Sequence, residues 1–297
     1  MAALIAIVST HTTRHLARTL LGVACQSRRP DRVVVSCDGD GADLRDEVGA
    51  ISEGLGLAVT LIQRAHAGVS RSGQVRNNAA RALSADGVGN DALLVFLDGD
   101  ICAAPGCFAA HERLARNADL VLGFRHDLTE EQTARFDDDA LRAGREPVAL
   151  SAEQRNAIRT REARYARQLF WRRWGFGKKH KPKLLSANFA VRMGVFSRIN
   201  GFDELYEGYG QEDDDLGRRL YGAGCRPALG LTEATAYHLW HPTRAPGDWE
   251  KSPNAARFLR GGPVRCVQGL ANPKPQGTIR RYEFGRDGKA AAATPEE

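Results

Sequence analysis

The sequence contains no apolar run that approaches the roughly 18 residues a membrane-spanning helix needs. It has no C-x-x-C pair, and the histidines near its 6 cysteines do not follow zinc-site spacing. Its N-terminal apolar run, residues 2–8, is too short for a signal peptide and has no basic segment before it. These absences predict free thiols in a reducing compartment and a cytoplasmic protein, at most peripheral to the inner face of a membrane.

The composition also lacks the marks of disorder, because 42% of the 297 residues are hydrophobic and 26% are charged. The formal net charge is +6. A modest basic excess suits polyanionic partners such as nucleotide diphosphates, nucleic acid or an anionic membrane face. Charge alone does not choose among them.

Short apolar runs alternate with helical patterns in the first third of the chain. The apolar runs are residues 4–8, 33–35, 57–62 and 93–97, and the helical patterns cover residues 16–21 and 74–83. This alternation predicts an α/β fold with a Rossmann-like, mostly parallel sheet and helices on both faces. Ligands of such sheets bind beyond the carboxyl ends of the strands, where polar residues follow several of these runs.

The character of the chain changes after residue 124. Residues 125–183 are charged and poor in β-branched side chains, which predicts a basic helical insertion. The core pattern resumes over residues 184–242. Residues 243–297 form an extension whose end, from about residue 272, is rich in Pro, Gly, Ala and charge and is expected to be loosely ordered.

Two carboxylates, Asp98 and Asp100, directly follow the fourth apolar run. Two residues apart in an extended segment, they can point the same way, and Gly99 lets the backbone turn between them. Mg²⁺ or Mn²⁺ commonly bridges such carboxylates to a diphosphate. Asp-Gly pairs are also abundant in ordinary turns, so a metal site and a turn are both open interpretations.

Four consecutive acids, residues 212–215, follow a Gly-rich loop that contains Tyr209 and Gly210. Acids in the first turn of a helix interact favourably with its macrodipole, which explains acids here in general. Clustered carboxylates also raise one another's pKa values, and that is one way to obtain a general base. Both interpretations stay open from the residues alone.

Two histidines, His238 and His241, lie three residues apart further along the chain. A lone histidine is more often an ordinary core or surface residue than a ligand. A metal held by Asp98 or Asp100 would still need further ligands, however, and neutral imidazole suits Mn²⁺.

Taken together, these motifs resemble the family 2 glycosyltransferases of the GT-A fold. The second half resembles the galactosyltransferase-type C-terminal module of related GT-A enzymes. The resemblance covers about residues 3–124 and 184–242. Its anchors are residues 8–11, 37–40, 76–80, 98–100, 200–204, 208–215 and 240–241. The insertion has no counterpart in that pattern, which leaves the identity of the acceptor open.

The resemblance implies a role for each matching residue. The nucleotide-binding residues are Thr10, Asp38, Arg76 and Asp98. The ligands of Mn²⁺ or Mg²⁺ are Asp100, Asp98 and His241, with His238 as the alternate. The catalytic base is Asp213, with Glu212 sharing the role or binding the acceptor. The acceptor-binding residues are Tyr209, Gly210 and Glu212.

The resemblance therefore implies a metal-dependent, inverting hexosyltransferase that uses a nucleotide-sugar donor, UDP-sugar by default. Residues 1–124 would bind the donor, and residues 184–242 would bind a glycan or glycolipid acceptor. Cell-surface polysaccharide or lipopolysaccharide assembly is the expected context, and no nucleic-acid partner is expected. The alternatives are a nucleotidyltransferase acting on sugar phosphates, a glycoside hydrolase, and a non-catalytic sugar-binding protein.

Residues 153–183 carry 11 Lys and Arg residues against 2 Glu, with aromatic residues among them. Aromatic and basic side chains together suit a membrane interface or an anionic acceptor. An ordinary solvated helix whose aromatic residues dock on the core is the competing interpretation.

Overall fold

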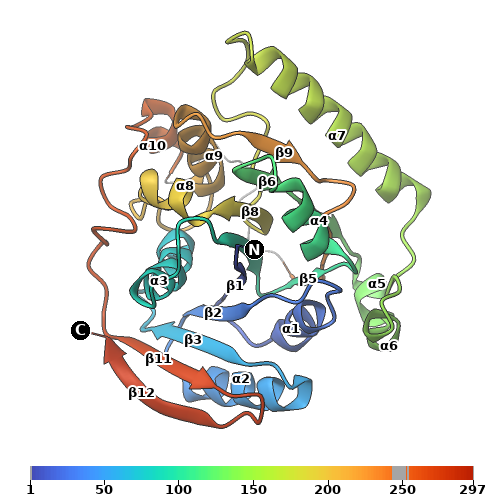
Figure 1. Cartoon of the computed structure of the whole chain (residues 1–297), viewed down its shortest axis with the longest axis vertical. Coiled ribbons are helices and arrows are strands. Elements are labelled where there is room, and N and C mark those ends of the chain that lie inside the picture. Colours follow the sequence, from blue (N-terminus) through green and yellow to red (C-terminus); the bar gives the residue numbers. More distant parts are fainter. Residues whose placement is uncertain (1, 243–251, 253, 297) are drawn as a thin grey trace.

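The computed structural model describes residues 2–242, 252 and 254–296; residues 243–251, where the expected C-terminal extension begins, lie outside the described residues. Four parallel strands in the order β3-β2-β1-β4 form the centre of a nine-stranded sheet (Figure 1). They are β1 (Leu4–Thr10), β2 (Arg32–Asp38), β3 (Val59–Arg64) and β4 (Leu93–Asp98). Their continuous runs of buried aliphatic residues suit strands that are covered on both faces.

Further strands extend this centre at both edges, and the first one on each side, β8 next to β4 and β11 next to β3, is antiparallel to its neighbour. Next to β4 lie β8 (Asn188–Arg192), β6 (Leu120–Leu122) and β9 (Pro227–Leu229). Next to β3 lie β11 (Ile279–Phe284) and β12 (Ala290–Glu296). The composition predicts a loosely ordered end from about residue 272, but the structure forms these two strands there. Pro and Gly are concentrated before and between the strands, whereas Phe284 is buried against Gly49 of the sheet's covering helix.

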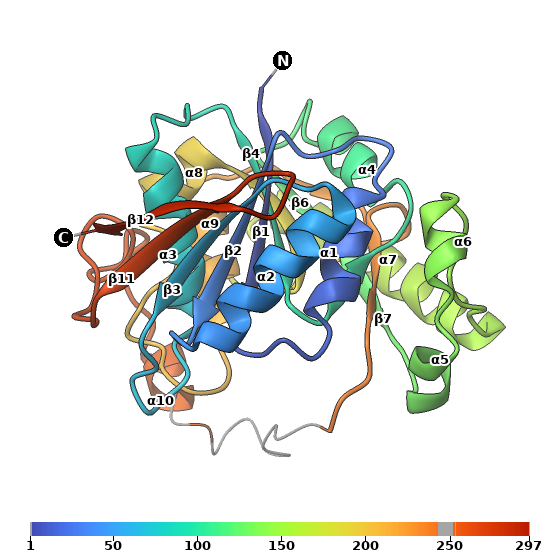
Figure 2. The ribbon, with the colours of Figure 1, turned by 90° about the horizontal axis from the view of Figure 1, so that it is seen from below.

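Helices cover both faces of the sheet, as predicted for the α/β fold class. On one face α1 (Leu16–Ala24), α2 (Ala42–Leu55) and α4 (Cys107–Leu114) share an apolar core with one set of alternating strand residues. On the other face α3 (Ser72–Ala85), α8 (Met193–Arg198) and α9 (Glu212–Gly222) share a second core with the opposite set. Figure 2 shows α1 and α2 in front of β1, β2 and β3.

A second, three-stranded sheet lies beside the first. Its order is β5 (Ile101–Ala103), β10 (Thr235–His238) and β7 (Phe124–Asp127). The insertion contains α5 (Glu130–Ala134), α6 (Asp138–Arg142) and the long α7 (Ala152–Arg172), and α10 (Ala255–Arg260) follows later. None of the helices in the described ranges combines the length and the apolar character that crossing a bilayer requires.

Candidate active site

The strands β1, β2 and β4 end at one edge of the sheet because their registers align. Ser9 lies opposite both Ser36 and Asp98 in the ladder. The turn after β4 packs closely on β1, since the amide of Gly99 donates to the carbonyl of Ser9 at 2.7 Å. A Cβ atom on residue 99 would lie 2.6 Å from the Cβ of Thr10, so only glycine fits there. Thr10 therefore supports the turn that carries Asp98 and Asp100.

Asp100 forms a cluster with both predicted histidines. Its Oδ2 lies 3.0 Å from Nε2 of His241 and 3.5 Å from Nε2 of His238. One ligand atom from each of the three residues lies within 4.8 Å of the others. The Oδ1 of Asp100 is buried without a hydrogen-bond partner among the described atoms, which leaves it available to a cation. Carboxylate oxygen and two imidazole nitrogens are a donor set that fits Mn²⁺.

The second sheet explains why these residues meet. In its ladder His238 of β10 lies opposite Ile101 of β5, and the amide of Leu239 donates to the carbonyl of Asp100 at 3.0 Å. On the other side His238 pairs with Asp127 of β7. The Nδ1–H of His238 donates to Oδ1 of Asp127 at 2.9 Å, which turns Nε2 toward Asp100. Asp127 is a site residue that was not predicted from the sequence. Its one sequence signal is that it follows the short apolar run of β6 by a few residues.

The charges in this cluster stabilise one another. Burial alone would raise the pKa of Asp100, but the hydrogen bond from His238 and the charges of both histidines lower it overall. Burial would lower the pKa of His238, but its hydrogen bonds to Asp100 and Asp127 raise it to about 9. A cation that binds here must displace the proton of His238, so its affinity should decrease as the pH falls.

Asp98 has different partners from Asp100. Its Oδ1 accepts a hydrogen bond from Oγ of Ser9 at 3.1 Å and forms an ion pair with Arg76 of α3. Within the described ranges Asp98 is not part of the three-residue cluster. The side chain of Arg76 is 4% exposed, and its guanidinium lies over the ring of Phe202. The structure thus brings the two predicted nucleotide-binding residues Asp98 and Arg76 together beside the cluster.

Glu212 and Asp213 occupy the first turn of α9, close to Arg76. Burial would lower the pKa of Arg76, but the charges of Asp98, Asp213 and Glu212 raise it overall. Burial and the charge of Asp213 raise the pKa of Glu212 to about 7. Burial also raises the pKa of Asp213 in spite of Arg76. Oδ2 of Asp213 accepts the amide hydrogen of Ser186 at 3.1 Å, and its Oδ1 is buried without a partner among the described atoms.

The other two acids of the run are engaged elsewhere. Asp214 lies 3.6 Å from Nζ of Lys181 and 3.4 Å from Nζ of Lys183. Asp215 is buried and accepts from Nε of Arg219 at 2.6 Å. Of the four acids, Glu212 and Asp213 are therefore the two whose charges act on Arg76.

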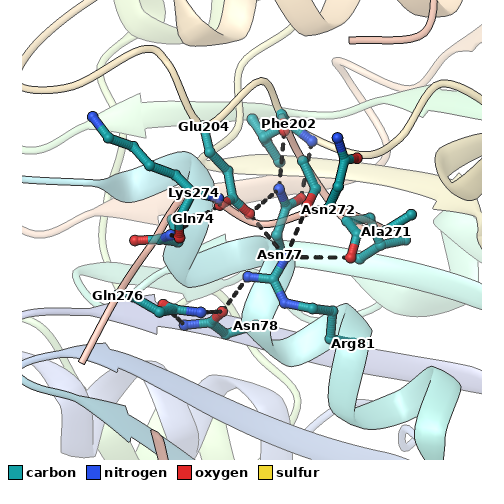
Figure 3. Close-up of polar contacts among 12 residues, drawn as sticks. Gln74, Asn77, Asn78, Arg81, Phe202, Glu204, Ala271, Asn272, Lys274 and Gln276 are labelled. Atoms are coloured by element: carbon teal, nitrogen blue, oxygen red, sulfur yellow. Dashed lines mark hydrogen bonds and ion pairs between the residues drawn. The ribbon is translucent and has the colours of Figure 1, made fainter. Parts of the chain in front are cut away.

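A buried polar network fixes α3 against the loop before α9 (Figure 3). Glu204 is 1% exposed and accepts from Asn77 at 2.8 Å and from Gln74 and Arg81 at 2.9 Å. The amide of Lys274 donates to the same carboxylate at 2.8 Å. Because Arg76 lies on the same helix as Asn77, this network holds the guanidinium between Asp98 and the acid pair.

Asp38 lies at the end of β2 in a separate corner of the strand edge. The register places it opposite Arg64 of β3, and the ion pair between them measures 2.6 Å. His66 Nδ1 lies 3.1 Å from the same oxygen, and the amide of Arg71 donates to the other oxygen at 3.2 Å. The buried carboxylate is thus surrounded by donors, and the half-exposed ring of His66 is the group nearest to solvent here. Arg64 and His66 were missed from the sequence.

The predicted acceptor loop, which contains Tyr209 and Gly210, has a backbone fixed by hydrogen bonds and an exposed side chain. Nδ2 of Asn254 donates to the carbonyls of Glu207 at 3.0 Å and Gly210 at 2.9 Å. Gln211 has a positive φ of 66° immediately before α9, a conformation that non-glycine residues adopt only under constraint. The side chain of Tyr209 is 59% exposed. The backbone of the loop is therefore fixed while Tyr209 is presented to solvent.

The large mixed sheet with helices on both faces matches solved glycosyltransferase structures of the GT-A fold. The structure of GalNAc-T7 with UDP, GalNAc and Mn²⁺ matches with a TM-score of 0.56 and 13% identity, covering 87% of this chain and 48% of that one. The structure of S. aureus TarS 1–349 with UDP-GlcNAc matches with a TM-score of 0.51 and 15% identity, covering 88% and 65%. The chain thus spans between about half and two thirds of these structures. The predicted fold class is confirmed.

Residues 170–241 match a family model described as the N-terminal domain of galactosyltransferase. The match begins at the end of α7 and includes α9 and both histidines of the cluster. It supports the resemblance of the second half to galactosyltransferases, whereas membership of family 2 and the likeness to a C-terminal module stay predictions. No curated protein sequence matches the chain.

Proposed function

We propose that the chain is a metal-dependent, inverting glycosyltransferase that transfers a sugar from a nucleotide diphosphate, UDP by default, to a hydroxyl group of a glycan or glycolipid. One observation carries the proposal: the buried guanidinium of Arg76 pairs with Asp98, two residues before Asp100 of the carboxylate–histidine cluster, and lies near the charges of two acids of raised pKa. A cation site beside a general base is what such a transfer requires. The two similar structures, one with UDP and one with UDP-GlcNAc, support the donor class.

The proposed roles follow the positions of the residues. Asp100, His238 and His241 would hold Mn²⁺ or Mg²⁺, which supplies positive charge to the leaving diphosphate. Arg76, paired with Asp98, adds a fixed positive charge near the same diphosphate. Asp213 would accept the proton of the acceptor hydroxyl, because its Oδ1 has no other partner among the described atoms.

Glu212 would bind an acceptor hydroxyl or share the proton, and Tyr209 and Gly210 would contact the acceptor from the adjacent loop. Thr10 and Asp38 would lie along the nucleotide, Thr10 by supporting the turn and Asp38 at the base or ribose. Assembly of a cell-surface glycan in the cytoplasm remains the predicted context.

A thermal-shift comparison tests the proposal directly. A ligand that binds only the folded state raises its apparent stability, by about 2.7 kcal/mol at a concentration 100 times its Kd. We expect UDP-sugars to raise the melting temperature in the presence of Mn²⁺ and to have little effect in the presence of EDTA. Sugar phosphates and free sugars are the controls. A shift with a sugar phosphate and a nucleoside triphosphate, but with no UDP-sugar, would favour a nucleotidyltransferase.

The raised pKa of Glu212 predicts a specific pH dependence of stability. Its pKa is 4.5 in the unfolded chain and about 7 in the fold, so between these values the folded state binds the proton more tightly. Stability from this group is thus fully present below about pH 4.5 and is lost as the pH rises through 7, on the order of 3 kcal/mol in all. Glu212→Gln stays neutral, so relative to the wild type it should become more stable as the pH rises.

Urea unfolding of the metal-free protein at several pH values measures this difference. Glu53→Gln, an exposed carboxyl on α2, is the matched control and should keep the wild-type slope. If Glu212→Gln and Glu53→Gln vary with pH in the same way, Glu212 titrates at its ordinary value and its assigned environment is wrong.

A further inference from the structure

The end of α7 and the loop after it expose an unusual group of aromatic side chains. We call residues 170–179 the aromatic tip. Phe170 is 53% exposed, Trp171 50%, Trp174 70% and Phe176 64%. Trp171 contacts Phe170 and Phe176 edge to face, at centroid distances of 5.4 and 6.2 Å. Figure 1 shows α7 along the outer edge of the molecule, with the tip at the top.

The aromatic tip lies in a part of the chain without negative charge. No Asp or Glu occurs between Glu162 and Asp203, while the same stretch contains 10 Lys and Arg residues. Arg173, Lys178 and Lys179 of the tip are exposed, and their side chains form no ion pair with any described residue. Exposed aromatic rings and unpaired cations therefore occupy the same surface.

The tip is held in place by residues other than its own aromatic side chains. Ile158 and Tyr165 bury the core-facing side of α7. The guanidinium of Arg172 lies 4.4 Å from the ring centroid of Tyr221 and donates to the carbonyl of Lys179 at 3.1 Å. Gly175, with φ of 79°, turns the chain back toward the sheet. The four rings thus expose apolar surface to water and do not anchor α7 to the core. This argues against the interpretation in which the aromatic residues dock on the core.

We propose that the aromatic tip docks on an anionic lipid bilayer surface. Trp and Phe favour the boundary between headgroups and acyl chains, and Lys and Arg beside them are attracted to anionic headgroups. Residues 170–179 have both features and contain no acid that would oppose them.

The position of the tip connects this docking to the candidate active site. Directly after the tip, Lys181 and Lys183 pair with Asp214, and the amide of Ser186 donates to Asp213. A bilayer at the tip would therefore lie on the same side as the acid pair. The docking itself does not depend on the proposed function. If that function holds, the acceptor is a lipid-linked sugar presented at the membrane surface.

Vesicle co-sedimentation of the full chain tests the docking without nucleotide or metal. The vesicles contain either phosphatidylcholine with phosphatidylglycerol or phosphatidylcholine alone. We expect binding only to the anionic vesicles and weaker binding at high salt. The double variant Lys178→Glu with Lys179→Glu should bind at least about tenfold more weakly, because each basic residue near an anionic surface contributes to the affinity. Trp174→Ala with Phe176→Ala should also weaken binding.

Matched controls separate the tip from general charge and apolar effects. Arg286→Glu with Lys289→Glu makes the same charge change in the exposed β11–β12 connection, at the far end of the molecule. Val267→Ala removes an apolar side chain that is 65% exposed in another part of the chain. Both controls should bind like the wild type. Failure of the wild type to bind anionic vesicles, or equal loss in the controls, would overturn the proposal. So would a wild-type dimer in analytical ultracentrifugation that the tip variants dissociate.

Discussion

Asp213→Asn should nearly abolish sugar transfer and leave donor binding intact. The substituted amide would keep the size of the side chain and could still accept the amide hydrogen of Ser186, but it could not accept a proton from an acceptor hydroxyl. Removal of a general base typically lowers the rate by about 10²- to 10⁴-fold. The loss should appear in kcat at saturating donor, measured as UDP release, while the affinity for UDP with Mn²⁺ changes little.

The position of Asp213 makes it a better candidate for the general base than the other acids of residues 212–215. Asp213 has one oxygen held by a backbone amide and one buried oxygen without a partner among the described atoms. Its raised pKa makes the carboxylate a better proton acceptor than an exposed aspartate. The first turn of α9, fixed by Gln211 and the loop before it, holds the group rigidly.

The chain offers a matched control one residue away. Asp214→Asn makes the same chemical change on a carboxylate that faces Lys181 and Lys183, and turnover should decrease only slightly. Glu212→Gln distinguishes the two members of the pair. If Asp213→Asn remains active while Glu212→Gln is inactive, the base is Glu212 and the assignment is misplaced by one residue.

The parallel centre of the sheet and the place of the site could be predicted from the sequence. Strands buried on both faces are continuous apolar runs, and residues 93–97 end directly at Asp98. Parallel strands bring their carboxyl ends to one edge, so motifs after β1, β2 and β4 had to be neighbours. The structure places Asp100 beside His238 and His241, and their role as metal ligands stays a prediction.

The partners of individual side chains could not be predicted, because they depend on registers and on helices from distant parts of the chain. Asp98 and Asp100 were expected to share one cation, yet in the structure Asp98 pairs with Arg76. That contact requires the Glu204 network to fix α3, and no local pattern indicates it. Asp127 likewise meets His238 only through the register of β7 with β10.

Weak local signals explain the missed elements. The helix α2 has a mixed pattern in which Gly49 and several charged residues interrupt the apolar face, so its 14 residues were not recognised as a helix. The strand β11 follows a segment rich in Pro and Gly. Judged by the composition of the whole extension, its alternating side chains were not recognised as a strand. In both cases packing against the sheet decides the structure more than local propensity does.

Asp100→Ala should abolish the metal dependence of UDP binding. Asp100 provides the only carboxylate of the cluster within the described ranges, and without it two histidines would face a divalent cation with no negative charge to offset it. Loss of residues that only orient metal ligands typically costs 10- to 100-fold in affinity, so loss of a ligand should cost at least about 100-fold. Calorimetry of Mn²⁺ binding, and of UDP binding with and without Mn²⁺, measures both effects.

The same strand provides the control for this change. Asp91 is an exposed carboxylate just before β4, at the opposite end from Asp100, and Asp91→Ala should bind Mn²⁺ and UDP like the wild type. Asp98→Ala separates the two aspartates of the turn. Because Asp98 pairs with Arg76, its loss should weaken UDP binding with and without Mn²⁺ alike, and leave Mn²⁺ binding by the cluster largely unchanged. If Asp100→Ala binds Mn²⁺ with unaltered affinity, the cation binds elsewhere. If Asp98→Ala loses as much Mn²⁺ affinity as Asp100→Ala, both carboxylates hold the cation.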